Sequence, residues 1–403
     1  MEIHDVSPVS DPELDRLVES WQQTLRVPAR ATYASRDQLT SRDLDALNLV
    51  GDPIAEDFVA AKNAAGLKDV DDLVALETLR DRGCAAAIAL WAAVNHVPSF
   101  IDFDEMRPAA SYAYRNVLAF TVLQFAAFPF TYTGANVAHV LDFSGRLGRD
   151  GDQVRRFWET IRATLSAFDI DAMRPGGESW ARWIRVRLMH TRVRLGIARS
   201  GTWDYGDGAP ISALNIAGGV YTFGTFLLLA GTSLGARPSQ PEYTATLRLW
   251  QWVTHLQGGP GELILENLDD QNASDRDLIR YLYRPTEAGR RLTADWIDCV
   301  AAGLDGNPLP KWLVQAAVRH ALTGSLTGMP ELASKAADDM HIPRNRGAGH
   351  IVRGIAALNA LIGWAGHLGL LRTRIERYGH NAAAKSVAQG LGGDDANHYT
   401  PLG

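Results

Sequence analysis

The sequence predicts an all-α protein folded as one large globular helical domain. Apolar residues recur three and four positions apart along most of the chain, which places them on one face of successive helices. Runs of alternating Val, Ile and Thr bounded by Asn-Gly or Asp-Gly turns, which would indicate strands, do not occur. Turns rich in Gly and Pro separate the helical segments, notably at Arg174–Gly177, Gly201–Pro210 and Gly258–Gly261.

The first predicted helix shows the pattern on which the others rest. It runs over Asp11–Arg26, and Asp11 is suited to cap its N-terminus. Its apolar face consists of Leu14, Leu17, Val18, Trp21 and Leu25. The same periodicity predicts, in chain order, helices over Pro53–Ala65, Asp71–His96, Pro108–Phe128, Gly134–Leu147, Asp152–Phe168, Ser179–Arg199, Ile211–Leu234, Glu242–Gln257, Glu287–Ala302, Lys311–Leu322 and Arg353–Ile375.

The chain is assigned to one domain because no Pro/Ser-rich tether, charge block or fixed-period repeat divides it. Within that domain we distinguish an N-terminal helical region over residues 1–107, packed on a core over 108–268, and a C-terminal helical region over 269–403. Length alone would also permit two domains.

Composition excludes several classes of protein. The chain has 403 residues, of which 46% are hydrophobic, and this is enough to bury a large core. Its 40 basic and 46 acidic residues give a formal net charge of −6, so nucleic acid is not an expected partner. Two cysteines, Cys84 and Cys299, cannot form a disulfide framework or a four-thiolate zinc site.

The N-terminus and two uncharged stretches indicate where the protein resides. The first residues carry no basic start or apolar run typical of a signal peptide, so we expect a cytoplasmic protein. The stretches Asn116–Leu141 and Gly208–Ala236 lack Asp, Glu, Lys and Arg and are long enough to cross a bilayer. Because both contain several polar residues, we interpret them as buried central helices, with a membrane protein as the alternative.

The segment around His190 carries the strongest candidate chemistry. In a helix, His190 shares a face with apolar residues and with Arg187 and Arg194, one turn away on either side. A buried haem requires such a set: an imidazole for iron, apolar walls for the macrocycle and cations for its propionates. Arg187 and Arg194 are therefore candidates for the propionates, with solvation or pairing with carboxylates as the alternatives. The residues alone leave three interpretations of His190 open, namely a core or surface histidine, an axial ligand and a general base.

This segment also resembles a known family. The block Arg185-Val-Arg-Leu-Met-His190 is preceded by Arg174-Pro-Gly-Gly and followed by Pro210-Ile-x-x-Leu-Asn215-x-x-Gly218. Further on, Leu249-Trp-x-x-Val-x-His255-Leu-x-Gly258 fits a second stretch. Together these motifs resemble the rubber oxygenase family, which includes the latex-clearing proteins, over roughly Pro108–Leu268. The resemblance implies a globin-like helical core around one haem b, with His190 as the protein ligand to iron.

In latex-clearing proteins the oxygen-binding side carries an arginine followed three and four residues later by lysine and threonine. The nearest counterpart in this sequence is Arg146-Leu-Gly-Arg149-Asp150, in which arginine and aspartate take the last two places. The resemblance therefore implies catalytic roles for Arg146, Arg149 and Asp150. The alternative is a solvated, charged helix end, for which this segment is well suited.

Other histidines and the aromatic residues have plainer interpretations. His139 is either a hydrogen-bonded core histidine, which we favour, or a group near the haem. His255 is expected to interact with the C-terminal end of its helix rather than to bind metal. The aromatic residues Phe120, Phe125, Phe128, Phe130 and Tyr132 are expected in the core rather than along a substrate channel.

The function that these observations favour is that of a haem b-dependent oxygenase. The resemblance implies dioxygen and a small hydrophobic substrate, isoprenoid-like or aromatic, as reactants, with oxidative cleavage or another oxygenation as the reaction. Two alternatives stay open: a non-catalytic protein that binds haem or a lipophilic ligand, and a helical protein without haem. A membrane is not an expected partner, and the oligomeric state is undetermined.

Overall fold

The computed structural model confirms the all-α fold. It describes residues 11–26, 39–143, 152–304, 307–365 and 369–391, and within these ranges the only β contact is an isolated bridge between Gly134 and Tyr283. The α-helices are α1 (Pro12–Arg26), α2 (Ser41–Asn48), α3 (Pro53–Ala64), α4 (Asp72–Asp81), α5 (Ala85–Asn95), α6 (Phe103–Arg115), α7 (Val117–Thr131), α8 (Ala135–Phe143), α9 (Asp152–Ser166), α10 (Glu178–Arg199), α11 (Ala213–Val220), α12 (Phe226–Ser233), α13 (Gln240–Leu256), α14 (Leu268–Leu282), α15 (Glu287–Ala302), α16 (Lys311–Ser325), α17 (Pro330–Ala333), α18 (Ala336–Asp339), α19 (Arg346–Ala365) and α20 (Gly369–Gly390).

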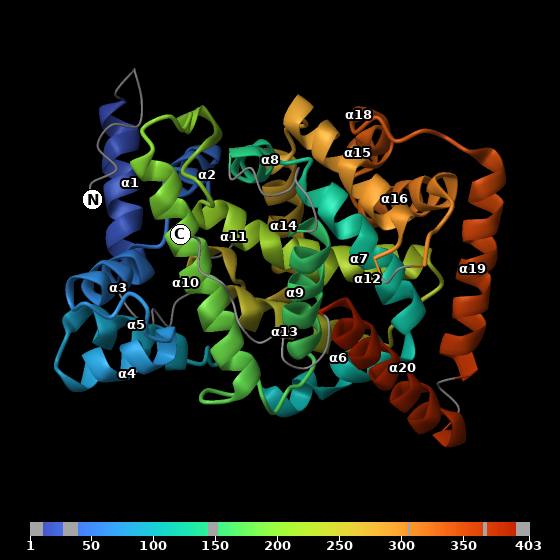
Figure 1. Cartoon of the computed structure of the whole chain (residues 1–403), viewed down its shortest axis with the longest axis horizontal. Coiled ribbons are helices and arrows are strands. Elements are labelled where there is room, and N and C mark those ends of the chain that lie inside the picture. The colour runs from blue at the N-terminus through green and yellow to red at the C-terminus, as the bar shows by residue number, and fades with distance from the viewer. Residues whose placement is uncertain (1–10, 27–38, 144–151, 305–306, 366–368, 392–403) are drawn as a thin grey trace.

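The two uncharged stretches form the centre of the molecule (Figure 1). Helix α12 packs on α7 and α16, and α13 packs on α6 and α11. The continuous helical segment Ala213–Ser233 is long and apolar enough to span a bilayer, but 71% of its most apolar window is buried inside the protein. The interpretation of this stretch as a buried central helix is therefore confirmed.

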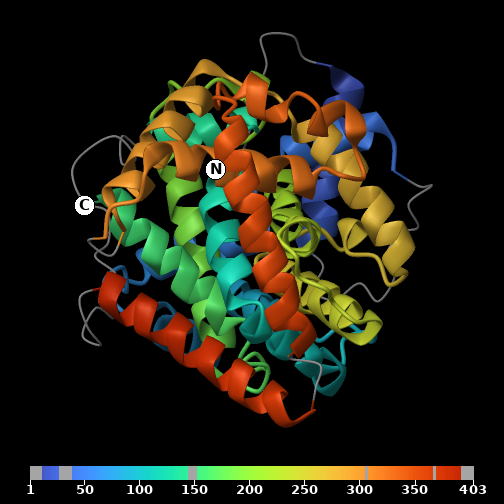
Figure 2. The ribbon, with the colours of Figure 1, turned by 90° about the vertical axis from the view of Figure 1, so that its right-hand side faces the viewer.

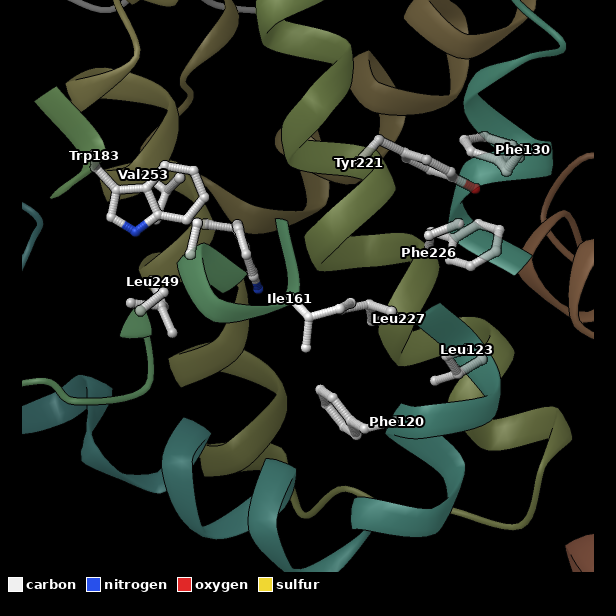
Figure 3. Packing of buried hydrophobic residues seen from close by; sticks show 14 of the residues in the cluster. Phe120, Leu123, Phe130, Ile161, Trp183, Tyr221, Phe226, Leu227, Leu249 and Val253 are labelled. Atoms are coloured by element: carbon white, nitrogen blue, oxygen red, sulfur yellow. The ribbon is translucent and has the colours of Figure 1, made fainter. Parts of the chain in front are cut away.

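A short π-helix (Tyr221–Thr225) joins α11 to α12 and lets the chain pass close to α13. A Cβ atom on Gly224 would lie only 2.9 Å from the Trp250 side chain, so only glycine allows this approach. The aromatic residues of α7 lie in or against the same core, as expected, and Phe128 stacks on Trp296. Figure 3 shows this core around Phe120, Ile161 and Leu227, which come from α7, α9 and α12.

Two predicted helices are each divided in the structure. The helix expected over Asp71–His96 ends at Asp81 and restarts at Ala85, because Gly83 adopts a left-handed conformation with φ +79°. The helix expected over Pro108–Phe128 is likewise two helices, α6 and α7, which meet at Asn116. Helix α6 also starts earlier than predicted, at Phe103, so that Pro108 lies inside the helix rather than at its start.

Helix α10 lies between the N-terminal helices and the core. It packs on α3 and α4 on one side and on α9 and α13 on the other (Figure 1). It begins after Gly177, a position at which only glycine fits, because a Cβ atom there would lie 2.3 Å from the Ala172 carbonyl oxygen. This helix carries His190, so its packing positions the candidate site.

Candidate functional site

His190 lies in the middle of α10, partly buried, and its ring is neutral at physiological pH. Burial, and then the positive charge of Arg194, lower its pKa to about 4 from the ordinary value of 6.5. Its Nδ1 atom is buried and has no hydrogen-bond partner among the described residues. The neutral imidazole therefore keeps a nitrogen lone pair, as a metal ligand requires, and its Nδ1 atom is shielded from water.

The polar atoms beside His190 are also incompletely paired. Gln257, which caps the end of α13, donates a hydrogen bond from Nε2 to the Trp183 carbonyl oxygen at 2.5 Å, and its side chain also interacts with the His190 ring. Its Oε1 atom and the Trp183 Nε1 atom are buried without a partner among the described residues. Apart from the interaction between Gln257 and the His190 ring, these buried polar atoms have no hydrogen bond, which leaves donors and acceptors for a bound molecule.

Large aromatic side chains extend from this group into the core. The rings of Trp183 and Trp250 meet edge to face with centroids 6.1 Å apart, and Phe223 and Phe168 contact Trp250 at 6.0 and 6.4 Å. Figure 3 shows Trp183 beside Val253 and Leu249 of α13. His190 thus adjoins an apolar region built from α10, α13 and the π-helix.

Arg187, expected to bind a haem propionate, already has a carboxylate partner in the structure. Its Nε and one terminal nitrogen donate to the two oxygens of Asp52 at 2.6 and 2.9 Å, and both side chains are less than 10% exposed. Gly258 allows this pair to form, because a Cβ there would lie 2.6 Å from an Asp52 oxygen. The alternative of carboxylate pairing is therefore what the structure shows, and a propionate contact stays a prediction.

Arg194, the second expected propionate partner, is also engaged. It donates to Glu56 at 3.2 Å and to the carbonyl oxygens of Pro210 and Ile211, the shortest bond being 2.6 Å. Ile211 has a φ of +50°, which is strained for a β-branched residue, so the guanidinium holds an unfavourable turn in place. Arg194 thus acts on His190 through its charge while its donors bind protein atoms.

Comparisons with known proteins bear on this architecture. No family model matches the chain, and no curated protein sequence matches it. Among solved structures, that of latex clearing protein in the closed state is similar, with a TM-score of 0.63 over 89% of this chain and 96% of the other, at 18% identity. This chain has the fold of latex clearing protein. The likeness of fold extends well beyond Pro108–Leu268, where the sequence motifs lie.

The residues expected on the oxygen-binding side of the latex-clearing-protein fold lie outside the described residues. These are Arg146, Arg149 and Asp150, which fall in the range 144–151. His139, the other candidate for that side, is hydrogen-bonded as expected but is not a core residue: its side chain is 38% exposed and its Nδ1 atom lies 2.5 Å from Asp207. Asp207 lines a polar pocket of about 200 Å³ that does not include His190.

Arg156 of α9 is a residue that sequence reasoning missed. Its charge lies close enough to His190 to lower the pKa of the imidazole, and it also acts on the buried hydroxyl of Tyr132. The sequence held a signal for it: Arg156-Phe-Trp-Glu159-Thr160 has an arginine followed four residues later by threonine, with glutamate in place of lysine. This segment matches the latex-clearing pattern better than Arg146-Leu-Gly-Arg149-Asp150 does.

His255 is a packing residue of α13. It stacks on Trp252 at 5.4 Å, and its Nε2 atom lies 3.0 Å from the Ala93 carbonyl oxygen. Burial lowers its pKa to about 4 from 6.5, so below pH 6.5 the unfolded chain binds a proton that the folded chain excludes. The contribution of neutral His255 to the free energy of unfolding is therefore fully present above pH 6.5 and is lost as the pH drops toward 4.

We expect His255→Gln to reduce this loss of stability by roughly 2 kcal/mol between pH 7 and pH 4.5, since each pKa unit corresponds to about 1.4 kcal/mol. Urea unfolding of the variant and the parent at both pH values measures the difference. The exposed His350→Gln provides the control. An identical pH dependence in the His255 variant and the parent would show that this ring titrates normally.

Proposed function

We propose that this protein is a haem b-dependent oxygenase that acts with dioxygen on a small hydrophobic substrate, isoprenoid-like or aromatic. The observation that supports this most directly is the neutral, partly buried His190, whose buried Nδ1 atom has no partner among the described residues, within the fold of latex clearing protein. No group of three or more His, Cys, Asp and Glu side chains suited to a bare metal ion occurs in the described ranges. A single imidazole instead suits iron that is already held by a porphyrin.

The residues present fit a haem in this role. His190 would provide a nitrogen ligand to the iron, and the buried aromatic side chains of Trp183 and Trp250 would provide apolar contact. Haem, when bound, supplies the iron that activates dioxygen, a reaction that no amino-acid side chain performs. The chain's own contribution is to hold the imidazole neutral, to exclude water and to place the charges of Arg194 and Arg156 nearby.

We assign Arg156 the role of stabilising negative charge that develops at the site during the reaction. Its guanidinium is positively charged and lies close enough to His190 to lower the pKa of the buried imidazole, so its charge acts at the site. Oxygenation transfers electrons to dioxygen, so a fixed cation favours it. Phe223 and Trp250 contribute apolar surface for a substrate without charges.

The test begins with the absorption spectrum of protein produced with a supply of haem. We expect a Soret band with one haem per chain and, after reduction, dioxygen consumption that depends on an added olefin such as squalene, with oxygenated products identified by mass spectrometry. A Soret band without substrate-dependent oxygen uptake would favour the non-catalytic haem protein. A colourless protein that does not take up haem would overturn the proposal.

Variants of two neighbouring arginines of α9 distinguish a specific role of Arg156 from a general effect of positive charge. Arg156→Leu should lower the rate of substrate-dependent oxygen uptake by about 100-fold while haem content is kept, as is usual when one charge-stabilising donor is removed. Arg155→Leu is the matched control, because Arg155 is exposed and forms an ion pair with Glu159. Equal rates for the two variants would remove Arg156 from the reaction.

A further inference from the structure

The large hydrophobic residues exposed to solvent are concentrated on the last two helices. Twelve such residues occur in the described part of the chain, and seven of them lie on α19 and α20. The seven are Ile351, Leu358, Leu361, Ile362, Trp364, Leu371 and Tyr378. We call these seven residues the C-terminal apolar face. Such a concentration of exposed apolar residues marks an interaction site on a protein.

Helix α19 faces outward with its large side chains and inward with its small and polar ones. Its buried residues are Ala348, Val352, Asn359 and Gly363. Asn359 donates to the Leu234 carbonyl oxygen at 3.1 Å, and the backbone of α19 lies so close to Gly235 that a Cβ there would meet the Ala356 oxygen at 1.9 Å. Leu361 and Trp364, by contrast, are each 65% exposed. The exposed apolar residues of α19 are thus not the ones that hold the helix on the protein.

The two helices lie along the outside of one side of the molecule. Figure 2 shows α19 running down this side and α20 crossing its lower part, and in Figure 1 they form the edge farthest from α3, α4 and α5. Helix α19 is not among the described helices that are long and apolar enough to cross a bilayer. Its position suits a helix that lies in the plane of a surface.

The charge of these helices is opposite to that of the chain. They carry six Arg and Lys residues and one acidic residue, Glu376, in a chain with a formal net charge of −6. Glu376 accepts a hydrogen bond from Arg372 at 2.9 Å, whereas Arg374 and Arg377 form no ion pair with any described residue. Exposed arginines therefore accompany the C-terminal apolar face.

We propose that α19 and α20 bind the protein to the surface of an anionic lipid bilayer, with the C-terminal apolar face inserted at the headgroup level. Apolar side chains including Trp, with arginines nearby, are the combination that such surface helices use. A symmetric dimer through this face would bring the arginines of the two copies together, whereas anionic lipid complements them. The proposal does not depend on haem or on the proposed oxygenase activity, and it departs from the expectation that a membrane is not a partner.

Vesicle flotation tests this proposal on the full-length protein. We expect it to float with vesicles of phosphatidylcholine containing roughly 30% phosphatidylglycerol, to bind pure phosphatidylcholine at least about tenfold more weakly, and to lose binding as salt is raised. The double variant Leu361→Ser/Trp364→Ser should bind the anionic vesicles about tenfold more weakly or worse, and so should Arg374→Gln/Arg377→Gln. All four positions are exposed, so folding is expected to be kept, and circular dichroism checks this.

The matched control is Val74→Ser/Ile88→Ser, which removes two exposed hydrophobic residues from α4 and α5 at the opposite edge of the molecule (Figure 1). It should bind vesicles as the parent does. Light scattering after gel filtration supplies a second measurement. The proposal is overturned if the parent does not float with anionic vesicles, if the control and the Leu361/Trp364 variant bind equally, or if that variant only converts a dimer to a monomer.

Discussion

Replacing His190 by alanine is expected to remove the protein's ligand to haem iron and with it substrate-dependent oxygen uptake. The imidazole is the candidate iron ligand, it is neutral because its pKa is about 4, and no described residue is bonded to its Nδ1 atom. Its removal should therefore leave the fold largely intact while the Soret band is lost or strongly shifted. Absorption and circular dichroism spectra of the same sample separate the two effects.

His190→Gly offers a stricter form of the same test. The cavity left by the ring should accept free imidazole, and the spectrum of the ligated haem should return as imidazole is added. The matched control is His320→Ala, which removes another partly buried histidine whose Nε2 atom lies 2.9 Å from the Ser233 carbonyl oxygen. An unchanged spectrum in His190→Ala would assign the iron to a different ligand.

The helices that the sequence predicted well are those with a regular apolar face. The prediction for α15 coincides with the structure at Glu287–Ala302, and that for α10 differs by one residue at its start. Helix α14 was missed for a physical reason: its buried residues include Gln271, Ser274 and Asp275, so no apolar period marks it. Asp275 accepts hydrogen bonds from Gln271 and Thr225, and burial raises its pKa to about 7.

The sequence predicts which residues of the candidate site share a helix, but not which residues distant in sequence they contact. Helical spacing alone places His190 with Arg187 and Arg194, since these lie one turn apart on the same helix. Their partners, Asp52 and Glu56, lie just before α3 and in its first turn, and they are 135 and 138 residues distant in sequence. Periodicity carries no information on such pairs, so the sequence could not distinguish an arginine that binds a cofactor from one that binds a carboxylate.

The buried pair of Arg187 and Asp52 gives the second large expected effect. Arg187→Met removes the partner of a carboxylate that is almost fully buried, and breaking such a pair costs about 3–5 kcal/mol in the free energy of unfolding. The matched control is Arg185→Met on the same helix, because Arg185 binds Asp71 with both side chains more than 40% exposed and should contribute at most about 1 kcal/mol. Urea unfolding measures both values.

The double variant Asp52→Asn/Arg187→Met distinguishes a structural pair from a cofactor contact. If the pair serves to tie α10 to α3, the double variant should lose less stability than the two single variants together, because neither buried charge is then left alone. In that case the haem affinity of the double variant should equal that of the parent, because the Arg187 guanidinium binds Asp52 and does not contact the cofactor. A loss of haem affinity in Arg187→Met beyond that of Asp52→Asn would instead place Arg187 at a propionate. A stability cost no larger than that of Arg185→Met would show that the buried pair does not hold the helix that carries His190.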